Sequence, residues 1–154
     1  MKKLLLGLLF FVAWSRTEAQ IENPVEWTFS ATKISAGVYD VVLTAQIEKP
    51  WHLYSQLTGK GGPIPTSINF RPNPLLQIAP GKAKEIGKPE RMLDPNFGQP
   101  PVPVVYFSNE VRFVKRVTVK GKVSTNIGGT VEYMVCNDSK CLPPTKKTFD
   151  IKLN

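Results

Sequence analysis

The two cysteines of this 154-residue chain, Cys136 and Cys141, are the residues whose type and spacing best support chemistry. Four turn-forming residues (137–140) separate them, and the pair Pro143-Pro144 follows. This spacing suits a β-hairpin connection closed by a local disulfide. Such a disulfide either pins the hairpin or exchanges with the thiols and disulfides of other proteins through a thiolate.

The size of the ring weakens a purely structural role. In the chain-entropy model, a six-residue loop gains only ~2 kcal/mol from closure, and a small ring tends to strain the bond. Lys140 would stabilise a thiolate at Cys141, whereas Asp138 would oppose it. Spacing alone still favours a hairpin disulfide over a redox pair, and both interpretations stay open. No metal site is expected, because two cysteines and one distant histidine, His52, make a poor ligand set.

The rest of the chain has the sequence pattern of β-structure. Several segments are rich in β-branched and aromatic residues and alternate between apolar and polar positions, and no segment sustains a helical period with caps at both ends. Short strands at regular spacing predict an all-β antiparallel sandwich. The expected strands are 26–29, 39–47, 66–70, 111–119, 130–135 and 148–153. The expected core residues are Trp27, Phe29, Val42, Phe113, Phe149 and Ile151.

The segment from Gly59 to Pro103 is irregular and contains repeated proline-rich turns. Because proline has no backbone N–H, these turns are not expected to form central strands. We therefore expect long proline-rich loops at one end of the sandwich. Loops of this length often carry function.

The N-terminus has the features of a secretory signal peptide. Met1-Lys2-Lys3 precedes an apolar run of 11 residues (4–14), and Thr17-Glu18-Ala19 offers a cleavage site before Gln20. The run is too short to span a bilayer of ~30 Å, although an uncleaved anchor is the alternative. We expect a cleaved signal at 1–19 and one exported, periplasmic domain at 20–154.

The charge of the chain does not predict a nucleic-acid partner. Removal of residues 1–19, which carry three basic residues and one acidic residue, lowers the formal net charge from +8 to +6. The lysines are spread along the chain, and no arginine cluster is available to grip phosphates. The charge would instead serve solubility or attract acidic partners and membrane surfaces weakly.

Three segments resemble the amino-terminal periplasmic domain of the thiol:disulfide interchange protein DsbD. The run YMVCNDSKCLPP (133–144) resembles its active-site hairpin, and KPWHLYS (49–55) resembles the aromatic strand beside the disulfide. DPNFG (94–98) is similar to its cap loop, where an aromatic residue covers the cysteines. The resemblance extends over essentially the whole mature chain. The ring is one residue shorter than in the best-known members. The sequence ends at Asn154, with no transmembrane electron-carrying domain and no thioredoxin-like domain after the sandwich.

The resemblance implies an immunoglobulin-like sandwich that carries reducing equivalents without a cofactor, in electron transfer such as that of cytochrome c biogenesis. Cys141 takes the role of the cysteine that attacks partners, and Cys136 that of the resolving thiol. A thioredoxin-like domain or a membrane electron-transfer protein would be the donor. Exported disulfide-containing proteins would be the acceptors, and we expect the module to be monomeric.

Five further residues are candidates for the surroundings of the cysteines. His52 titrates near neutral pH and would serve as a base, but its place in a strand favours a structural, hydrogen-bonded role. Tyr54 shares a face with His52 in a regular strand, and core packing and a site role are equally supported. Phe97, after the turn residue Asn96, is favoured as a cap over the disulfide rather than as a loop anchor. Asp94 would orient the cap or tune the thiols, although a solvated loop carboxylate is the favoured interpretation.

Two other functions stay open from the sequence. A non-catalytic immunoglobulin-like binding module would keep the disulfide only to pin its hairpin, since a fold alone does not give a function. A carbohydrate-binding or surface-assembly module would use Trp51 and the proline-rich loops. The reduction potential of the Cys136–Cys141 pair distinguishes the binding module from a relay. A value below about −300 mV marks a structural bond that resists exchange.

Overall fold

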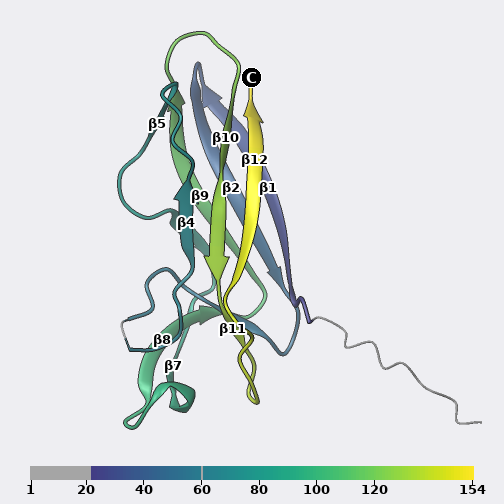
Figure 1. Ribbon diagram of the computed structural model, residues 1–154, viewed down its shortest axis with the longest axis vertical. Helices are drawn as coiled ribbons and strands as arrows, with labels where there is room; N and C mark the ends of the chain where they lie inside the picture. The colour runs from purple at the N-terminus through teal and green to yellow at the C-terminus, as the bar shows by residue number, and fades with distance from the viewer. Residues whose placement is uncertain (1–21, 60) are drawn as a thin grey trace, which may run out of the picture.

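The computed structural model describes residues 22–59 and 61–154 as three antiparallel sheets, two of which face each other as a sandwich (Figure 1). The elements are β1 (Val25–Ser35), β2 (Val38–Ile47), β3 (His52–Tyr54), β4 (Ser67–Phe70), β5 (Leu76–Ile78), β6 (Lys84–Gly87), β7 (Glu90–Asp94), the 3-10 helix η1 (Pro95–Phe97), β8 (Val102–Phe107), β9 (Glu110–Val119), β10 (Thr125–Tyr133), β11 (Val135–Cys136) and β12 (Thr145–Leu153).

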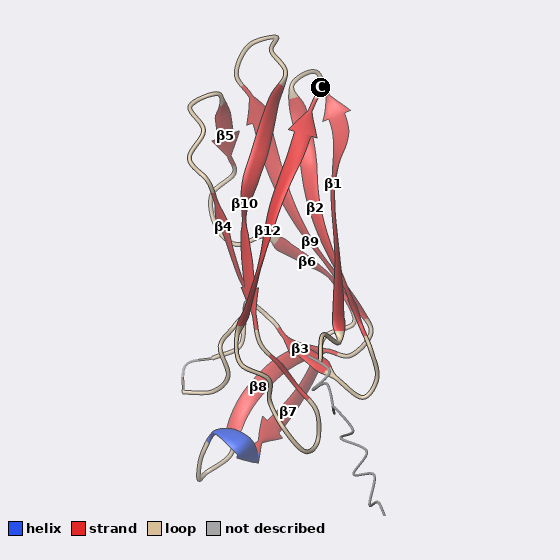
Figure 2. Cartoon of the chain, turned by 45° about the vertical axis from the view of Figure 1, so that its right-hand side comes forward, coloured by secondary structure: helices blue, strands red, loops and turns tan. Residues whose placement is uncertain are grey.

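The strand order places the two cysteines at one end of the sandwich. The first large sheet has the order β1-β2-β9-β5, with β6 also paired to β9, and the second has the order β12-β10-β4. The third sheet, β11-β3-β8-β7, lies at the lower end in Figures 1 and 2. The C-terminus lies at the opposite end (Figure 1).

The main hydrophobic core fills the space between the two large sheets. Aromatic rings cross this space: the centroids of Trp27 and Tyr133 are 5.2 Å apart, and those of Phe29 and Phe149 are 5.4 Å apart. Strands alternate inward and outward residues with a period of two, and every second residue of β2 and β9 is buried. The buried apolar residues of β2 and β9 are Tyr39, Val41, Leu43, Ala45, Ile47, Val111, Phe113, Val117 and Val119.

The prediction of an all-β antiparallel sandwich is confirmed, and five of the six expected strands each correspond to one observed strand. The sixth, 130–135, is divided between β10 and β11, which belong to different sheets. Phe113, Phe149 and Ile151 are buried, and Trp27 and Phe29 are half-buried against the core. The core assignment of Val42 is wrong. Val42 is only half-buried, because it lies on the face of β2 opposite to its buried neighbours Val41 and Leu43.

The expectation of long proline-rich loops at one end is not met. Between Gly59 and Pro103 the chain forms β4, β5, β6, β7, η1 and the start of β8, and these elements join all three sheets. Most of the prolines stand between strands. Pro103 lies inside β8 opposite Leu93 of β7, whereas β8 pairs with β3 at Tyr106 and Phe107. A proline is tolerated at position 103 because this part of β8 is paired with β7 but not with β3.

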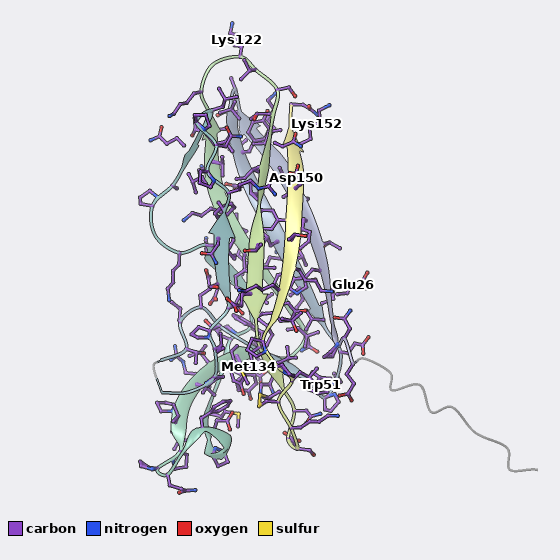
Figure 3. All side chains as sticks on the ribbon, in the orientation of Figure 1. Glu26, Trp51, Lys122, Met134, Asp150 and Lys152 are labelled. Atoms are coloured by element: carbon purple, nitrogen blue, oxygen red, sulfur yellow. A yellow bond between two sulfur atoms is a disulfide. The ribbon has the colours of Figure 1, made fainter. Side chains whose placement is uncertain are left out.

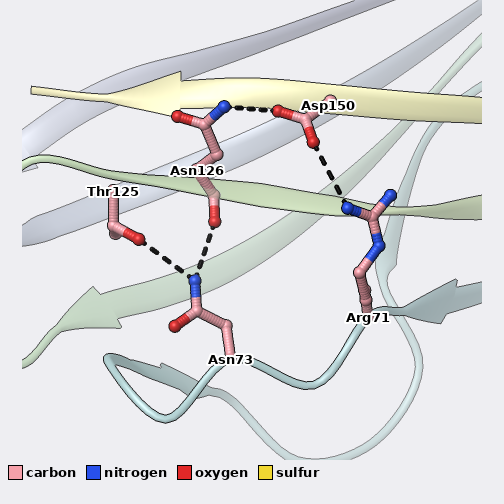
Figure 4. Close-up of polar contacts among 5 residues, drawn as sticks. All are labelled: Arg71, Asn73, Thr125, Asn126 and Asp150. Atoms are coloured by element: carbon pink, nitrogen blue, oxygen red, sulfur yellow. Dashed lines mark hydrogen bonds and ion pairs between the residues drawn. The ribbon is translucent and has the colours of Figure 1, made fainter.

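A polar cluster holds the β4–β5 connection against the second sheet (Figure 4). The Asn73 side-chain amide donates to the Thr125 hydroxyl at 3.1 Å and to the Asn126 carbonyl at 2.9 Å. Asn126 in turn donates to Asp150, whose carboxylate also lies 3.5 Å from Arg71. The charged pair is exposed, so its own contribution to stability is small. The contacts instead fix where β4 ends and β5 begins.

Gly129 is the tightest point of the second sheet. A Cβ at this position would lie 2.3 Å from the Asn69 carbonyl oxygen and 2.7 Å from the Phe149 ring. We expect Gly129→Ala to lower the free energy of unfolding by about 1–3 kcal/mol, because the sheet must shift to admit the methyl group. Urea denaturation measures this loss. Gly59→Ala is the matched control, since nothing lies within 4 Å of its Cβ. Equal effects of the two substitutions would contradict the prediction.

The expected signal peptide at 1–19 lies outside the described residues. Within residues 22–59 and 61–154, no helix is long and apolar enough to cross a membrane.

Candidate functional site

The two cysteines form a disulfide at the tip of the hairpin between β11 and β12. Their Cα atoms are 4.0 Å apart. The Asn137 N–H donates to the Lys140 carbonyl, and the Asn137 side chain accepts from the Lys140 N–H at 2.9 Å, so the turn inside the ring is closed by its own hydrogen bonds. Outside the ring, the Leu142 N–H donates to Val135 at 2.9 Å.

The two sulfur-bearing residues differ in their access to solvent. Cys136 is fully buried with 0% of its surface exposed, whereas Cys141 is partly exposed. Cys136 is buried because β11 pairs with β3 and places it directly opposite His52. An attacking thiolate needs access to sulfur, so the geometry favours Cys141 as the residue that meets another protein.

A separate small core surrounds the cysteines. Tyr54, Val104 and Cys136 are its buried members, and Phe97 and Cys141 are among the half-buried residues that pack against it. The third sheet builds this core from strands that are distant in sequence. Figure 3 shows Met134 and Trp51 at the lower end of the two large sheets, where the cysteine hairpin begins.

A polar chain runs through this core from His52 to Asp94. The Tyr54 hydroxyl donates to the Asp94 carboxylate at 2.9 Å and lies 3.2 Å from Nε2 of His52. Because the hydroxyl proton points to Asp94, Nε2 of His52 must carry the proton that it donates to the Tyr54 oxygen. The two side chains share one face of β3, as the spacing predicted, and His52 has the hydrogen-bonded place favoured from the sequence.

The interpretation of Asp94 as a solvated loop carboxylate is wrong. Asp94 ends β7 and is fully buried, with 0% of its surface exposed. The sequence around it is rich in turn residues, but pairing of β7 with β8 places the side chain beneath Tyr54. A buried carboxylate needs hydrogen-bond donors, and the Tyr54 hydroxyl is one of them.

Burial is the main cause of the pKa shifts of His52 and Tyr54. Burial lowers the pKa of His52 below its ordinary 6.5, and it outweighs the opposing attraction of nearby carboxylates, of which Asp94 is the strongest. Burial, followed by the hydrogen bond to Asp94, raises the pKa of Tyr54 far above its ordinary value. Both groups are therefore neutral at pH 7.

The lowered pKa of His52 predicts a loss of stability at mildly acidic pH. The unfolded chain accepts a proton near pH 6.5, but the folded protein resists it until the pH reaches its lower folded-state pKa. The stability is present above pH 6.5 and falls as the pH drops toward that folded-state value, by ~1.4 kcal/mol for each unit of pKa shift.

Urea titrations between about pH 7.5 and about pH 5 measure this loss, with His52→Gln as the variant that cannot titrate. We expect the stability of the variant to depend less on pH in this window than that of the natural chain. Identical pH dependence in both proteins would show that His52 does not carry the effect.

The aromatic residue of the 94–98 segment lies in the cysteine core. Phe97 ends η1, is half-buried, and meets the Tyr54 ring edge-to-face with centroids 6.1 Å apart. Asn96 lies within η1, so its backbone forms the turn that presents Phe97. This brings Phe97 to the same cluster as both cysteines, as a cap requires.

The charged residue beside Cys141 is engaged elsewhere. The Lys140 ammonium lies 2.6 Å from the Glu22 carboxylate and 5.9 Å from the centre of the Trp51 ring. Its stabilisation of a thiolate at Cys141 is therefore offset by Glu22. Trp51 is buried with only 7% of its surface exposed. It does not offer the exposed aromatic platform that a carbohydrate-binding module would use.

Four residues of the cysteine core were not predicted from the sequence to surround the disulfide: Met92, Val104, Tyr106 and Met134. Tyr106 has its ring centroid 4.7 Å from that of His52. Val104 and Tyr106 belong to the apolar run Val102–Phe107, which would have indicated a strand had Pro103 not stood inside it. Among the described residues, no group of three or more His, Cys, Asp or Glu side chains is placed to hold a metal ion.

Comparison with known proteins identifies the family. The family model described as "Thiol:disulfide interchange protein DsbD, N-terminal" matches residues 18–153. The N-terminal periplasmic domain of ScsB from Proteus mirabilis shares the fold, with a TM-score of 0.54 and 18% identity over 84% of this chain and 46% of that chain. This chain thus spans less than half the length of that structure.

Two structures from Neisseria meningitidis are also similar. The reduced DsbD N-terminal domain has a TM-score of 0.46 and 19% identity over 83% of this chain and 86% of that chain. A complex of the DsbD and PilB N-terminal domains contains a chain with a TM-score of 0.44 and 16% identity, over 80% of each. No curated protein is significantly similar in sequence. The family match covers nearly the whole sequence and agrees with the cysteine hairpin, so the chain belongs to the DsbD N-terminal domain family.

Proposed function

We propose that this chain is a periplasmic thiol–disulfide exchange module that relays reducing equivalents through Cys136 and Cys141. The observation that carries the proposal is the asymmetry of the disulfide: one cysteine is fully buried, the other is partly exposed, and both belong to a small aromatic core. A bond that only pins a hairpin needs no such arrangement. Membership of the DsbD N-terminal family supports the same chemistry.

The exchange has two steps. In the reduced module, the Cys141 thiolate attacks one sulfur of a disulfide in an exported acceptor, which forms a mixed disulfide and releases the acceptor's other sulfur as a thiolate. The Cys136 thiolate then attacks the Cys141 sulfur and releases the acceptor's remaining thiolate. The module ends oxidised, and the acceptor has gained two electrons and, after protonation of its thiolates, two thiols.

Re-reduction runs the same steps in the opposite direction. A dithiol donor, for which we propose a thioredoxin-like domain, attacks the Cys141 sulfur of the oxidised module, because Cys136 is buried. The Cys136 thiolate leaves, and the donor's second thiolate resolves the mixed disulfide. The neutral His52 and Tyr54 hold the walls of the site through their hydrogen bonds and have no covalent part in these steps.

Electron transfer from a reduced thioredoxin-like domain tests the proposal. The oxidised chain is mixed with an equimolar amount of that domain, thiols are labelled with a bulky maleimide, and gel mobility reports the redox state of both proteins. We expect both cysteines of the chain to become labelled while the donor becomes oxidised. The Cys136→Ser, Cys141→Ser double variant is the control and must leave the donor reduced. A chain that stays oxidised in this mixture, and also after the donor is raised to an excess, would contradict the proposal and favour a structural disulfide.

A further inference from the structure

The sandwich is open along one edge, away from the cysteines. β4 ends the second sheet there, and β5 and β6 share the corresponding edge of the first sheet. Figures 1 and 2 both show β4 and β5 on the side opposite β1. A cleft of about 650 Å³ lies between these edges, with Ile68, Phe70 and Ile78 among its apolar walls. Its volume is in the range of small-molecule sites.

Lys115 borders this cleft and occupies an unusual position. It is at an inward position of β9, in register with the buried Val111, Phe113 and Val117, and only 5% of its surface is exposed. β5 and β6 pair with β9 on either side of it, and the chain between them loops out at this point. Lysine is rarely buried without a partner, so its position requires an explanation.

The ammonium of Lys115 has partners, but none of them carries charge. It donates to the carbonyl of Pro80 at 3.3 Å and to that of Gly81. No carboxylate of the described residues forms an ion pair with it. An ammonium has three N–H donors, so the two carbonyls leave one donor without an acceptor among residues 22–59 and 61–154.

The remaining lining of the cleft has the same sign of charge. Lys82 also borders it, and neither Asp nor Glu belongs to the described lining. Lys82 donates to the Gln56 carbonyl. The cleft therefore combines apolar walls with two cations that no acidic side chain of the cleft neutralises. This combination is complementary to a molecule with an apolar body and one anionic end.

We infer that the cleft is a binding site for a small amphipathic carboxylate. The apolar chain lies along Ile68, Phe70 and Ile78, and the carboxylate accepts a hydrogen bond from the third N–H of the Lys115 ammonium. None of the aromatic residues around the disulfide borders the cleft, so binding does not require the exchange chemistry.

Titration of the oxidised full chain with dodecanoate below its micelle concentration tests this site. We expect saturable binding by calorimetry, with dodecanoate bound about tenfold or more tightly than dodecanol, because one charge-assisted hydrogen bond is worth at least that factor. Lys115→Met should remove this preference. Lys152→Met, a change of an exposed lysine on β12 (Figure 3), should leave it intact.

A second variant keeps the test independent of the folding of Lys115→Met. Ala79 is half-buried and borders the cleft, so Ala79→Phe should fill the space and abolish dodecanoate binding while Lys115 is retained. Amide chemical shifts should move for residues of β4 and the β5–β6 connection. Equal affinity for dodecanoate and dodecanol, unchanged binding by Ala79→Phe, or shifts confined to another face would overturn the inference.

Discussion

Cys136→Ser is expected to accumulate mixed disulfides with thioredoxin-like and other exported proteins through Cys141. The partly exposed Cys141 forms the first covalent bond, and the variant lacks the thiol that would release the partner. Cys141→Ser should trap little or nothing, because its remaining thiol is fully buried. If exposure of Cys136 requires a local opening of about 3 kcal/mol, its reaction slows on the order of hundredfold.

Non-reducing gels of periplasmic extracts, with mass spectrometry of the trapped cysteine, measure both variants. The double variant Cys136→Ser, Cys141→Ser controls for non-covalent association. Trapping by Cys141→Ser instead of Cys136→Ser would reverse the two roles. Absence of trapping by either variant would argue against exchange.

Phe97→Ala is expected to accelerate reduction of the disulfide by dithiothreitol about tenfold. Phe97 is half-buried against the core that contains Tyr54 and the cysteines, so a small thiol reaches the bond more readily once the ring is removed. Burial of a phenylalanine side chain contributes about 1.5–3 kcal/mol. Because Phe97 is half-buried, we take about half of the upper value, which corresponds to a tenfold change in the population of conformations that expose the disulfide.

The rate follows from the appearance of free thiols under pseudo-first-order conditions. Leu93→Ala is the matched control, because Leu93 is a nearby apolar residue of β7 with 65% of its surface exposed and does not belong to the cysteine core. We expect its rate to equal that of the natural chain. An unchanged or slower rate in Phe97→Ala would show that this ring does not cover the disulfide.

The long strands were predictable because their patterns are local. The sequences of β2 and β9 are rich in β-branched and aromatic residues and alternate in part, and β12 alternates strictly over 148–153. Such patterns mark strands that are buried on one face. The third sheet was not predictable in this way. β3 has three residues and β11 has two, and they are held by pairing with each other and with β8 rather than by their own sequences.

The site could be predicted only where a motif was local or a family resemblance was available. The cysteine spacing indicated a hairpin disulfide, and the resemblance led to Phe97. Asp94 was misjudged because its burial depends on Tyr54, 40 residues away in sequence. The inward position of Lys115 was hidden for a similar reason, since the carbonyls that accept from it belong to Pro80 and Gly81.

The reduction potential of the Cys136–Cys141 pair tests the proposed exchange most directly. Equilibration of the full chain with glutathione or dithiothreitol buffers, followed by thiol labelling, gives this value. We predict a potential above about −300 mV, in the range of roughly −120 to −270 mV where exchanging dithiols operate. A potential below about −300 mV would identify a structural bond that resists exchange and would contradict the proposed relay.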